Sequence, residues 1–374
     1  DPHLRQCLHI VQTASTSFVP IGPGVKIAYR WLDLSDNVQI APAASSKAPT
    51  AADAAGNASC RSRIPLVMQV DFRSGMDLWD PLFLAHLLTR RPVLIFDPCH
   101  CGRSISDRDT RPYMGSLYKW AKHLVAVTEN LAFPEYDVFG LSMGGAAALL
   151  TALFPTPATS RVRKIIAGAT TGPAITTRLY EECARSSMSI PWPRDDWNLM
   201  DASLYSYSDG NDSGEVRDTM RGVFFTNTRQ GQEAMQAYWT RINAAAEVRA
   251  ALPGESPSIR LLEDRRDLGP LRCQRLAWRS WESAPSNPSA YADPMASIDK
   301  PVLVLNGVNS ALIPASRSWE LVCRLPKASL VLYENASAGF AYQYPDRVAR
   351  DINNFLDLDH TQLEAQSLPS AALP

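Results

Sequence analysis

The stretch Gly140-Leu-Ser142-Met-Gly144 has the residue types and the spacing of a nucleophilic serine. It follows a short apolar run and precedes an alanine-rich stretch that favours helix, so a strand–turn–helix would lift the Ser142 hydroxyl above a sheet. A serine hydroxyl is a weak nucleophile near neutral pH. It needs a base within hydrogen-bond reach and a third group that orients this base. Acyl transfer at Ser142 therefore depends on finding both partners elsewhere in the chain.

The elements that would position Ser142 are strand patterns separated by helical patterns. Apolar runs of strand length occur at 64–70, 92–97, 136–140, 163–168, 301–306 and 328–333, and residues 25–33 alternate like a half-exposed strand. Helical patterns cover about 78–90, 114–131, 143–153, 316–325 and 343–357. This alternation predicts an α/β fold, with a mostly parallel sheet that helices cover on both faces.

A long, mostly helical and aromatic-rich segment interrupts the alternation. It predicts a lid inserted at the carboxyl edge of the sheet, above the site that this edge carries. Five tryptophans lie in the segment, and we interpret most of them as its packing core: Trp192, Trp197, Trp239, Trp278 and Trp281. The predicted organisation is a first core part at 1–171 with a polar linker at 41–62, a lid at 172–297, a second core part at 298–358 and a polar tail at 359–374.

These features together resemble the α/β-hydrolase superfamily. The resemblance is carried by "FRSGMDLWDP" at 72–81, "FDPCHCGRS" at 96–104, "GLSMGG" at 140–145, "PVLVLNG" at 301–307 and "GFAYQYP" at 339–345. It spans nearly the whole chain beyond the linker and implies the α/β-hydrolase fold with a helical lid. The stretch at 72–81 resembles a microbial branch, expected here to be fungal, whose members usually carry a histidine just before that phenylalanine.

The chain departs from this family at both partners of the serine. Working members carry an acid after a late strand and a histidine after the last strand. The matching positions here are Ser310, within "GVNSALIP", and Ala338, within "NASAGF". The resemblance therefore implies a degenerate catalytic triad in which Ser142 has lost its base.

The positions of the histidines support this interpretation. None of them lies between Ser142 and residue 359; the six are His3, His9, His86, His100, His123 and His360. His100 follows the strand at 92–97 and is the candidate for a base at the rim of the site. His360 belongs to the polar tail.

Asp71 is a third departure, because it stands where the branch usually has its histidine. In acyl transfer this loop donates hydrogen bonds to a developing oxyanion, which an ionised aspartate would repel. Burial could instead keep Asp71 protonated, so that it donates a hydrogen bond. The alternative is that Asp71 turns away and bonds Arg73 or loop amides.

We predict a largely apolar pocket with a few hydroxyls and one carboxylate. Ser142 and Asp71 are its candidate catalytic residues. The candidate substrate-binding residues are Phe72, Met143, Ser310, Ala338, Phe340, Tyr238, Trp239 and Phe224, with Phe225 as a further wall residue. Such a pocket suits a hydrophobic small molecule of polyketide or terpenoid type.

The leading functional prediction is a non-hydrolytic cyclase, pericyclase or isomerase/lyase of natural-product biosynthesis. One alternative is a serine esterase with a non-standard triad that uses Ser142 with His100 or with a displaced acid, Asp293 or Asp299. Another is a catalytically inactive ligand-binding protein. Covalent labelling of Ser142, or tight binding of a ligand that is released unchanged, would distinguish these alternatives.

Composition excludes several other classes. A net charge of −1 gives no reason to expect nucleic acid or an anionic membrane as a partner, and no run approaches the length of a membrane span. No phosphate loop, metal cluster or cofactor-binding lysine is indicated, so no cofactor is predicted. The chain begins without methionine and has seven cysteines and sequons at Asn57, Asn211 and Asn335, which slightly favours the secretory pathway over the cytoplasm. Oligomeric state is not indicated.

Overall fold

The computed structural model describes most of the predicted core and part of the predicted lid. The described residues are 1–34, 64–72, 74–106, 116–154, 161–173, 223–255, 274, 276–278, 280–281 and 293–359. Several sequence predictions lie outside them: the linker at 41–62, Trp192, Trp197, Arg73, His360 and the tail beyond residue 359.

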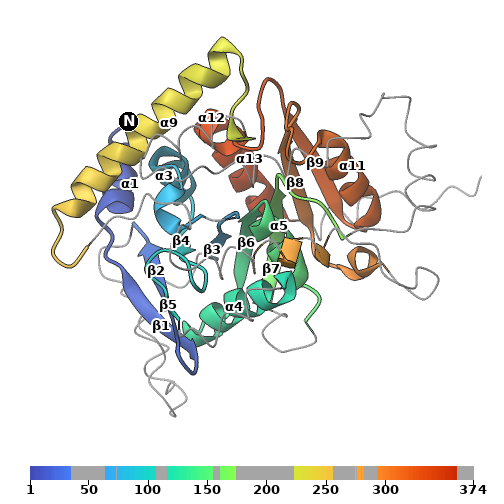
Figure 1. Cartoon of the computed structure of the whole chain (residues 1–374), viewed down its shortest axis with the longest axis horizontal. Coiled ribbons are helices and arrows are strands. Elements are labelled where there is room, and N and C mark those ends of the chain that lie inside the picture. The colour runs from blue at the N-terminus through green and yellow to red at the C-terminus, as the bar shows by residue number, and fades with distance from the viewer. Residues whose placement is uncertain are drawn as a thin grey trace, which may run out of the picture.

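Within the described residues, the strands form a nine-stranded sheet with the order β1-β2-β4-β3-β6-β7-β8-β9, and β5 pairs with β2 (Figure 1). All pairings from β4 to β9 along this path are parallel, whereas β2 pairs antiparallel with β1, β4 and β5. The strands are β1 (Ser17–Gly22), β2 (Val25–Leu32), β3 (Leu66–Gln69), β4 (Val93–Phe96), β5 (Ile105–Ser106), β6 (Tyr136–Leu141), β7 (Val162–Gly168), β8 (Val302–Gly307) and β9 (Ala328–Tyr333). The predicted mostly parallel sheet is confirmed.

Helices cover both faces of this sheet, which explains why β3, β4, β6 and β8 are buried at every position. One apolar core lies under α1 (Pro2–Thr13), α3 (Pro81–Leu88), α9 (Arg229–Ala250), α12 (Phe340–Gln343) and α13 (Pro345–Asp357). The other lies under α4 (Leu117–Asn130), α5 (Met143–Thr151) and α11 (Ala315–Arg324). The helices α3, α4, α5, α11 and α13 correspond to the five predicted helical patterns.

The structure differs from the sequence prediction at the amino-terminal end. The sequence analysis does not predict α1 and β1, and it predicts a half-exposed strand at 25–33. In β2 the side chain of Lys26 is exposed, but that of Arg30 is only 1% exposed. The alternating pattern does not indicate exposure here, because β2 lies between β1 and β4. The charge of Arg30 is compensated by a buried ion pair.

The helix α9 is the main described part of the predicted lid. It lies across α1 and α3, close to α12 (Figure 1). Thr228 caps its first turn by accepting a hydrogen bond from Gly231 N at 3.1 Å. Further along, Arg241 Nε donates to Asp80 Oδ1 at 2.9 Å, and Arg249 donates from Nη2 to the carbonyl of Val11 at 2.6 Å. The helix is therefore fastened to the core along its length. The predicted boundaries of the lid stay a prediction.

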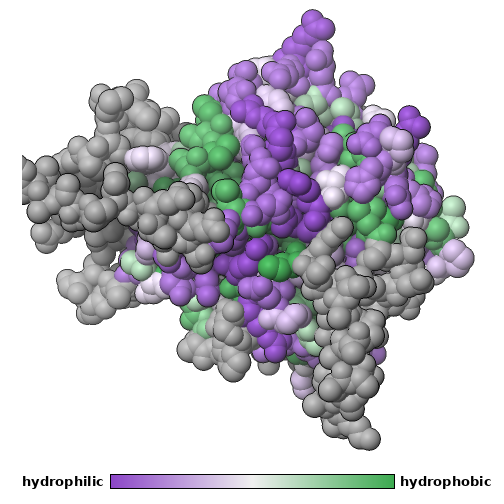
Figure 2. Space-filling view, turned by 180° about the vertical axis from the view of Figure 1, so that it is seen from behind, coloured by the Kyte–Doolittle hydropathy of each residue, from purple (hydrophilic) through white to green (hydrophobic). Residues whose placement is uncertain are grey.

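One face of the described residues is largely hydrophilic (Figure 2). On the face seen from behind, hydrophilic residues cover most of the area, and apolar residues form smaller separate groups (Figure 2). The described helices include none with the length and apolarity that crossing a membrane requires.

Candidate active site

The turn between β6 and α5 holds Ser142 in a strained backbone conformation. Its φ of 54° and ψ of −118° lie in a region that residues with a Cβ rarely adopt. Two glycines are required there because of close backbone contacts. A Cβ on Gly140 would lie 2.0 Å from the carbonyl oxygen of Gly144, and one on Gly144 would lie 2.3 Å from that of Val70. The turn thus has the geometry of a nucleophile elbow, pressed against the end of β3.

Two backbone amides beside this turn are available for a ligand. Met143 N and Phe72 N make no hydrogen bond to any described residue. Met143 begins α5, so the partial positive charge of the helix N-terminus adds to its amide. Such donors stabilise an oxygen that gains negative charge during a reaction. The side chains of Met143 and Phe72 pack on the α4–α5 core instead.

The loops that follow β8 and β9 lie against each other. Asn309 N donates to the carbonyl of Ala336 at 2.9 Å, and a Cβ on Gly307 would lie 2.3 Å from the carbonyl oxygens of both Ala336 and Ser337. In the first loop, Ser310 is buried and its hydroxyl accepts a hydrogen bond from Ile313 N at 3.3 Å. The hydroxyl of Ser310 therefore has a structural partner within its own loop.

The loop after β9 also contacts the segment that leads into α9. Gly339 N donates to the carbonyl of Phe224 at 2.9 Å, and the hydroxyl of Ser337 donates to the carbonyl of Val223 at 2.7 Å. Ala338 lies between these two contacts and is buried. The ring of Phe340 stacks on that of Tyr333, with centroids 5.2 Å apart.

No imidazole or carboxylate of the described residues hydrogen-bonds to Ser142, which is itself 6% exposed. His100 lies close to His123. Burial lowers the pKa of His123 to about 4, and the charges of His100 and Lys119 contribute to this shift. The displaced acids of the alternative triad have other roles. Asp293 caps a short helix and forms a two-pronged ion pair with Arg324, at 2.7 and 2.8 Å. Asp299 is 77% exposed.

Asp71 lies in the turn directly after β3 and is 5% exposed. Burial raises the pKa of its carboxyl to about 7, although a hydrogen bond from the Ser74 side chain opposes this shift. Within the described part of the chain, no cationic group lies at ion-pair distance from it. Its charge contributes to the raised pKa values of Tyr238 and Tyr342, so Asp71 lies near both hydroxyls.

The short helix η1 (Met76–Leu78), five residues beyond Asp71, is held by three buried polar groups, of which the sequence analysis names only Tyr238, as a substrate-binding residue. Asp97 accepts a hydrogen bond from Met76 N at 2.7 Å. Arg30 donates to Asp77 at 2.6 Å, and Tyr238 donates its hydroxyl proton to the carbonyl of Leu78 at 2.8 Å. These contacts fix the loop that carries Asp71.

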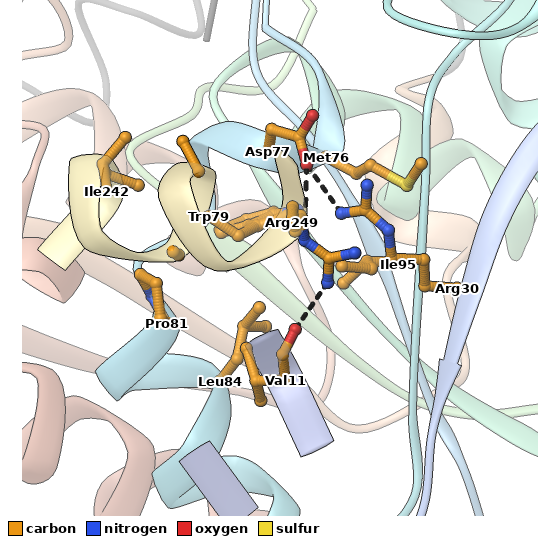
Figure 3. Close-up of a pocket in the computed structure, with 12 residues that line it drawn as sticks. Val11, Arg30, Met76, Asp77, Trp79, Pro81, Leu84, Ile95, Ile242 and Arg249 are labelled. Atoms are coloured by element: carbon orange, nitrogen blue, oxygen red, sulfur yellow. Dashed lines mark hydrogen bonds and ion pairs between the residues drawn. The ribbon is translucent and has the colours of Figure 1, made fainter. Parts of the chain in front are cut away.

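A small cavity of about 20 Å³ lies under η1, between α1, α3 and α9 (Figure 3). Arg30, Asp77 and Arg249 line its polar side, and Trp79 and Leu84 belong to its apolar side. This volume suffices for one water molecule and is too small for an organic substrate.

Comparisons with known proteins agree with this geometry. A family model described as the alpha/beta hydrolase family matches residues 72–351. The chain belongs to the α/β-hydrolase family. None of the curated proteins matches this α/β-hydrolase in sequence at a significant level.

Solved structures share the fold of this α/β-hydrolase along nearly its whole length. An alpha/beta hydrolase fold protein from Chitinophaga pinensis has a TM-score of 0.66 and 22% identity, covering 93% of this chain and 99% of that chain. An enol-lactonase from Burkholderia xenovorans LB400 has a TM-score of 0.57 and 14% identity, and the match covers 91% of this chain and 100% of that chain. A thermophilic esterase from Thermogutta terrifontis has a TM-score of 0.56 and 16% identity, and the match covers 92% of this chain and 98% of that chain. At these identities the similarity shows the fold alone, and the predicted fungal origin stays a prediction.

Several aromatic residues at α9, at α12 and just before α9 pack against one another in one layer. Tyr342, which the sequence analysis does not name as a site residue, lies at the centre of this layer. Its ring stacks on Tyr238 with centroids 4.7 Å apart and on Phe224 at 5.8 Å. Trp239 contacts the edge of this group, with its centroid 5.3 Å from that of Tyr238. Among the described residues, no three His, Cys, Asp or Glu side chains are grouped to hold a metal ion.

Proposed function

We propose that this α/β-hydrolase is a non-hydrolytic enzyme of natural-product biosynthesis that cyclises or isomerises a hydrophobic small molecule. Asp71 is its acid–base group. The observation that carries the proposal is a buried carboxyl beside the nucleophile elbow, with a pKa of about 7 and no cationic partner among the described residues. Near neutral pH such a group is present in both protonation states, which is the condition for efficient general acid–base catalysis.

The environment of Ser142 supports a role other than attack on an acyl group. Ser310 and Ala338 occupy the two loops in which the family carries its acid and its histidine. Neither residue can take a proton from Ser142 near neutral pH, and no described imidazole hydrogen-bonds to it. Ser142 thus remains a neutral hydroxyl that can donate a hydrogen bond to a substrate oxygen.

The apolar surroundings support a hydrophobic substrate of polyketide or terpenoid type. Aromatic rings of α9 and α12 belong to the same apolar core as Phe340. The charge of Asp71 contributes to the raised pKa values of Tyr238 and Tyr342. A site of this kind can hold a flexible chain in one reactive conformer, which supplies up to ~7–11 kcal/mol of an intramolecular barrier in favourable cases. The amides of Met143 and Phe72, which make no hydrogen bond to a described residue, can bind a carbonyl oxygen of the same substrate.

The experiment is a screen of unsaturated, apolar polyketide- and terpenoid-like compounds with mass spectrometric detection. Cyclisation or isomerisation gives a product of unchanged mass, whereas hydrolysis adds one water. We expect products of unchanged mass, and we expect Asp71→Asn to lower their formation by about 10²–10⁴-fold. The matched control is Asp346→Asn, which makes the same chemical change at an exposed position of α13. Equal turnover by Asp71→Asn and the unaltered protein would refute the acid–base role.

A second candidate function is ester hydrolysis at Ser142, and a specific observation favours it. Ser142 keeps the strained φ of 54°, and the amide of Met143 makes no hydrogen bond to a described residue. The esterase from Thermogutta terrifontis shares this fold. An alkyl fluorophosphonate, followed by intact mass and peptide mapping, distinguishes the two functions. A stoichiometric adduct on Ser142 favours hydrolysis, and the absence of an adduct on folded protein favours the acid–base function.

A further inference from the structure

Asp97 follows β4 directly, and its carboxylate holds two loops together. The residue is 1% exposed. Its Oδ1 accepts a hydrogen bond from Met76 N, and its Oδ2 accepts one from Arg103 N, each at 2.7 Å. Met76 begins η1, whereas Arg103 belongs to the loop after β4. An ionised carboxyl can accept at both oxygens in this way, whereas an amide side chain accepts at only one.

Two glycines leave room for this carboxylate. A Cβ on Gly75 would lie 2.9 Å from Oδ1 of Asp97, and a Cβ on Gly102 would overlap Oδ2. Gly102 also has a φ of 51°, which glycine adopts without strain. Gly75 has an ordinary φ of −114°, so the constraint on this residue is its contact with Asp97. The backbones of both loops therefore close around the carboxylate.

The side chain of Arg103 makes a second connection between the same loops. It donates from Nη1 to Asp77 Oδ2 at 2.6 Å, and Asp77 is the residue after Met76. Met76 and Asp77 both line the small cavity shown in Figure 3. Arg103 is thus bound to Asp97 through its backbone and to η1 through its side chain, which fixes η1 relative to the end of β4.

The segment that Asp97 holds follows directly on the turn that carries Phe72. Ser74 N donates to the carbonyl of Asp71 at 3.3 Å, which closes this turn. The end of β3 fixes the start of the turn, and the bond from Met76 to Asp97 fixes the chain after it. Phe72 N lies within the turn and makes no hydrogen bond to any described residue. Its direction is therefore set from both ends.

We propose that Asp97 is the positioning residue of the Phe72 amide, which it holds in the direction needed to bind a substrate oxygen. Asp97 acts through the backbone, because it is buried and each of its oxygens already binds a backbone N–H. The inference rests on the proposed function in one respect, the binding of a substrate oxygen by this amide.

The hold on the two loops depends on the charge of Asp97. Burial raises the pKa of its carboxyl to about 6, although the hydrogen bonds from Arg103 N and Met76 N oppose this shift. The charge of Asp77 adds to the rise, and that of Arg103 opposes it. The thiol of Cys101 stays neutral, because burial raises its pKa. Below the pKa of Asp97 one carboxyl oxygen carries a proton, so one of the two hydrogen bonds is weakened.

The test follows two backbone amides by NMR and needs no substrate. The dipeptides Gly75-Met76 and Asp71-Phe72 each occur once in the sequence. Protein labelled with ¹³C-carbonyl glycine and ¹⁵N methionine therefore gives one signal in an experiment that selects ¹³C–¹⁵N bonds, that of the Met76 amide. Protein labelled with ¹³C-carbonyl aspartate and ¹⁵N phenylalanine gives that of the Phe72 amide.

The variants are Asp97→Asn, which keeps the shape and removes one acceptor, and Gly75→Ala, which pushes the carboxylate from its place. The matched control is Asp137→Asn. Asp137 is also a buried aspartate and accepts a hydrogen bond from Arg163 at 2.9 Å. It lies at the start of β6, whereas Ser142 follows the end of that strand.

We expect the Met76 amide proton of the unaltered protein to move upfield as the pH falls through about 6, because its bond to Asp97 loses the charge of the acceptor. Asp97→Asn should abolish this movement. Both Asp97→Asn and Gly75→Ala should shift the Phe72 signal. Asp137→Asn should lower the melting temperature and move neither signal.

Turnover gives a second readout, for any compound that the screen proposed above converts. Above the pKa of Asp97, Asp97→Asn should lower kcat by about tenfold or more with little change in KM, because the amide acts on an oxygen that gains charge during the reaction. The ratio of kcat between the unaltered protein and Asp97→Asn should approach one below this pKa. A purely structural role would leave the ratio independent of pH.

Different results would overturn different parts. A Phe72 signal that stays in place in both Asp97→Asn and Gly75→Ala would overturn this inference and leave the proposed function standing. If Asp97→Asn does not fold, Gly75→Ala and the pH titration of the unaltered protein decide, and two unmoved signals overturn the inference. Shifted signals, together with product formation that Asp71→Asn leaves unchanged, would instead overturn the proposed function.

Discussion

Arg30 and Asp77 form a buried ion pair, with 2.6 Å between Nη1 and Oδ1 and with side chains that are 1% and 7% exposed. Arg103 binds the other carboxylate oxygen of Asp77 at 2.6 Å, and Arg249 approaches the same carboxylate from α9 (Figure 3). Asp77 therefore joins β2, the loop after β4 and the helix α9 at the point where the Asp71 loop must be held.

We expect Asp77→Ala to lower the free energy of unfolding by about 3–5 kcal/mol, because it removes a carboxylate shared by three buried guanidinium groups. Glu255 then remains as the only carboxylate paired with Arg30 and Arg249 among the described residues. Replacing Arg30 as well, in Arg30→Met/Asp77→Leu, should recover part of this loss. Urea unfolding followed by circular dichroism measures both effects. The control is Arg229→Met, which breaks an exposed pair with Glu233 and should cost about 0.5 kcal/mol or less. A loss at Asp77 no larger than that of the control would contradict this account.

The backbone of Ser142 allows a direct test of strain. Glycine adopts a positive φ without the steric cost that a Cβ imposes, so Ser142→Gly should be more stable than Ser142→Ala by about 1–2 kcal/mol. Thermal unfolding of the two variants gives the difference. Equal stability would mean that the turn relaxes when the hydroxyl is removed.

Burial of Asp71 also predicts a pH dependence of stability. Its pKa is about 7 in the folded protein and near the ordinary aspartate value when unfolded, so the folded state holds the extra proton between these values. Stability should therefore fall as pH rises towards 7 and level off above it. Asp71→Asn should lack this decline. The difference in unfolding free energy between the variant and the unaltered protein should therefore change by about 2–3 kcal/mol from pH 5 to pH 7. Urea titrations at several pH values provide the measurement, and parallel curves would show that Asp71 titrates normally.

The pairing of Asp293 with Arg324 predicts a structural role for this acid. Asp293→Asn loses the ionic part of a two-pronged contact that connects α11 to the start of the short helix η5 (Pro294–Ser297). We expect a loss of about 1–3 kcal/mol in unfolding free energy. The reaction of Ser142 with a fluorophosphonate, however slow, should proceed at the same rate in the variant. A changed labelling rate would return Asp293 to the set of triad candidates.

The sequence predicted the parts of the fold that short-range patterns encode. Gly140 and Gly144 flank Ser142 within five residues, and the apolar strand runs are equally local. The buried ion pairs are not local, because Arg30 and Asp77 are separated by 47 positions. From the sequence alone, a charged side chain such as Arg30 in an alternating strand pattern is therefore predicted to be solvent-exposed. Tyr342 was missed for a similar reason, since its stacking on Tyr238 depends on α9 and α12 packing together.

The attachment of α9 at two points along its length has an evolutionary consequence. Arg241 on Asp80 and Arg249 on the end of α1 hold Tyr238 and Trp239 in a fixed position on the core. A lineage of such proteins can therefore exchange single side chains on this helix while the position of the helix on the core is inherited unchanged.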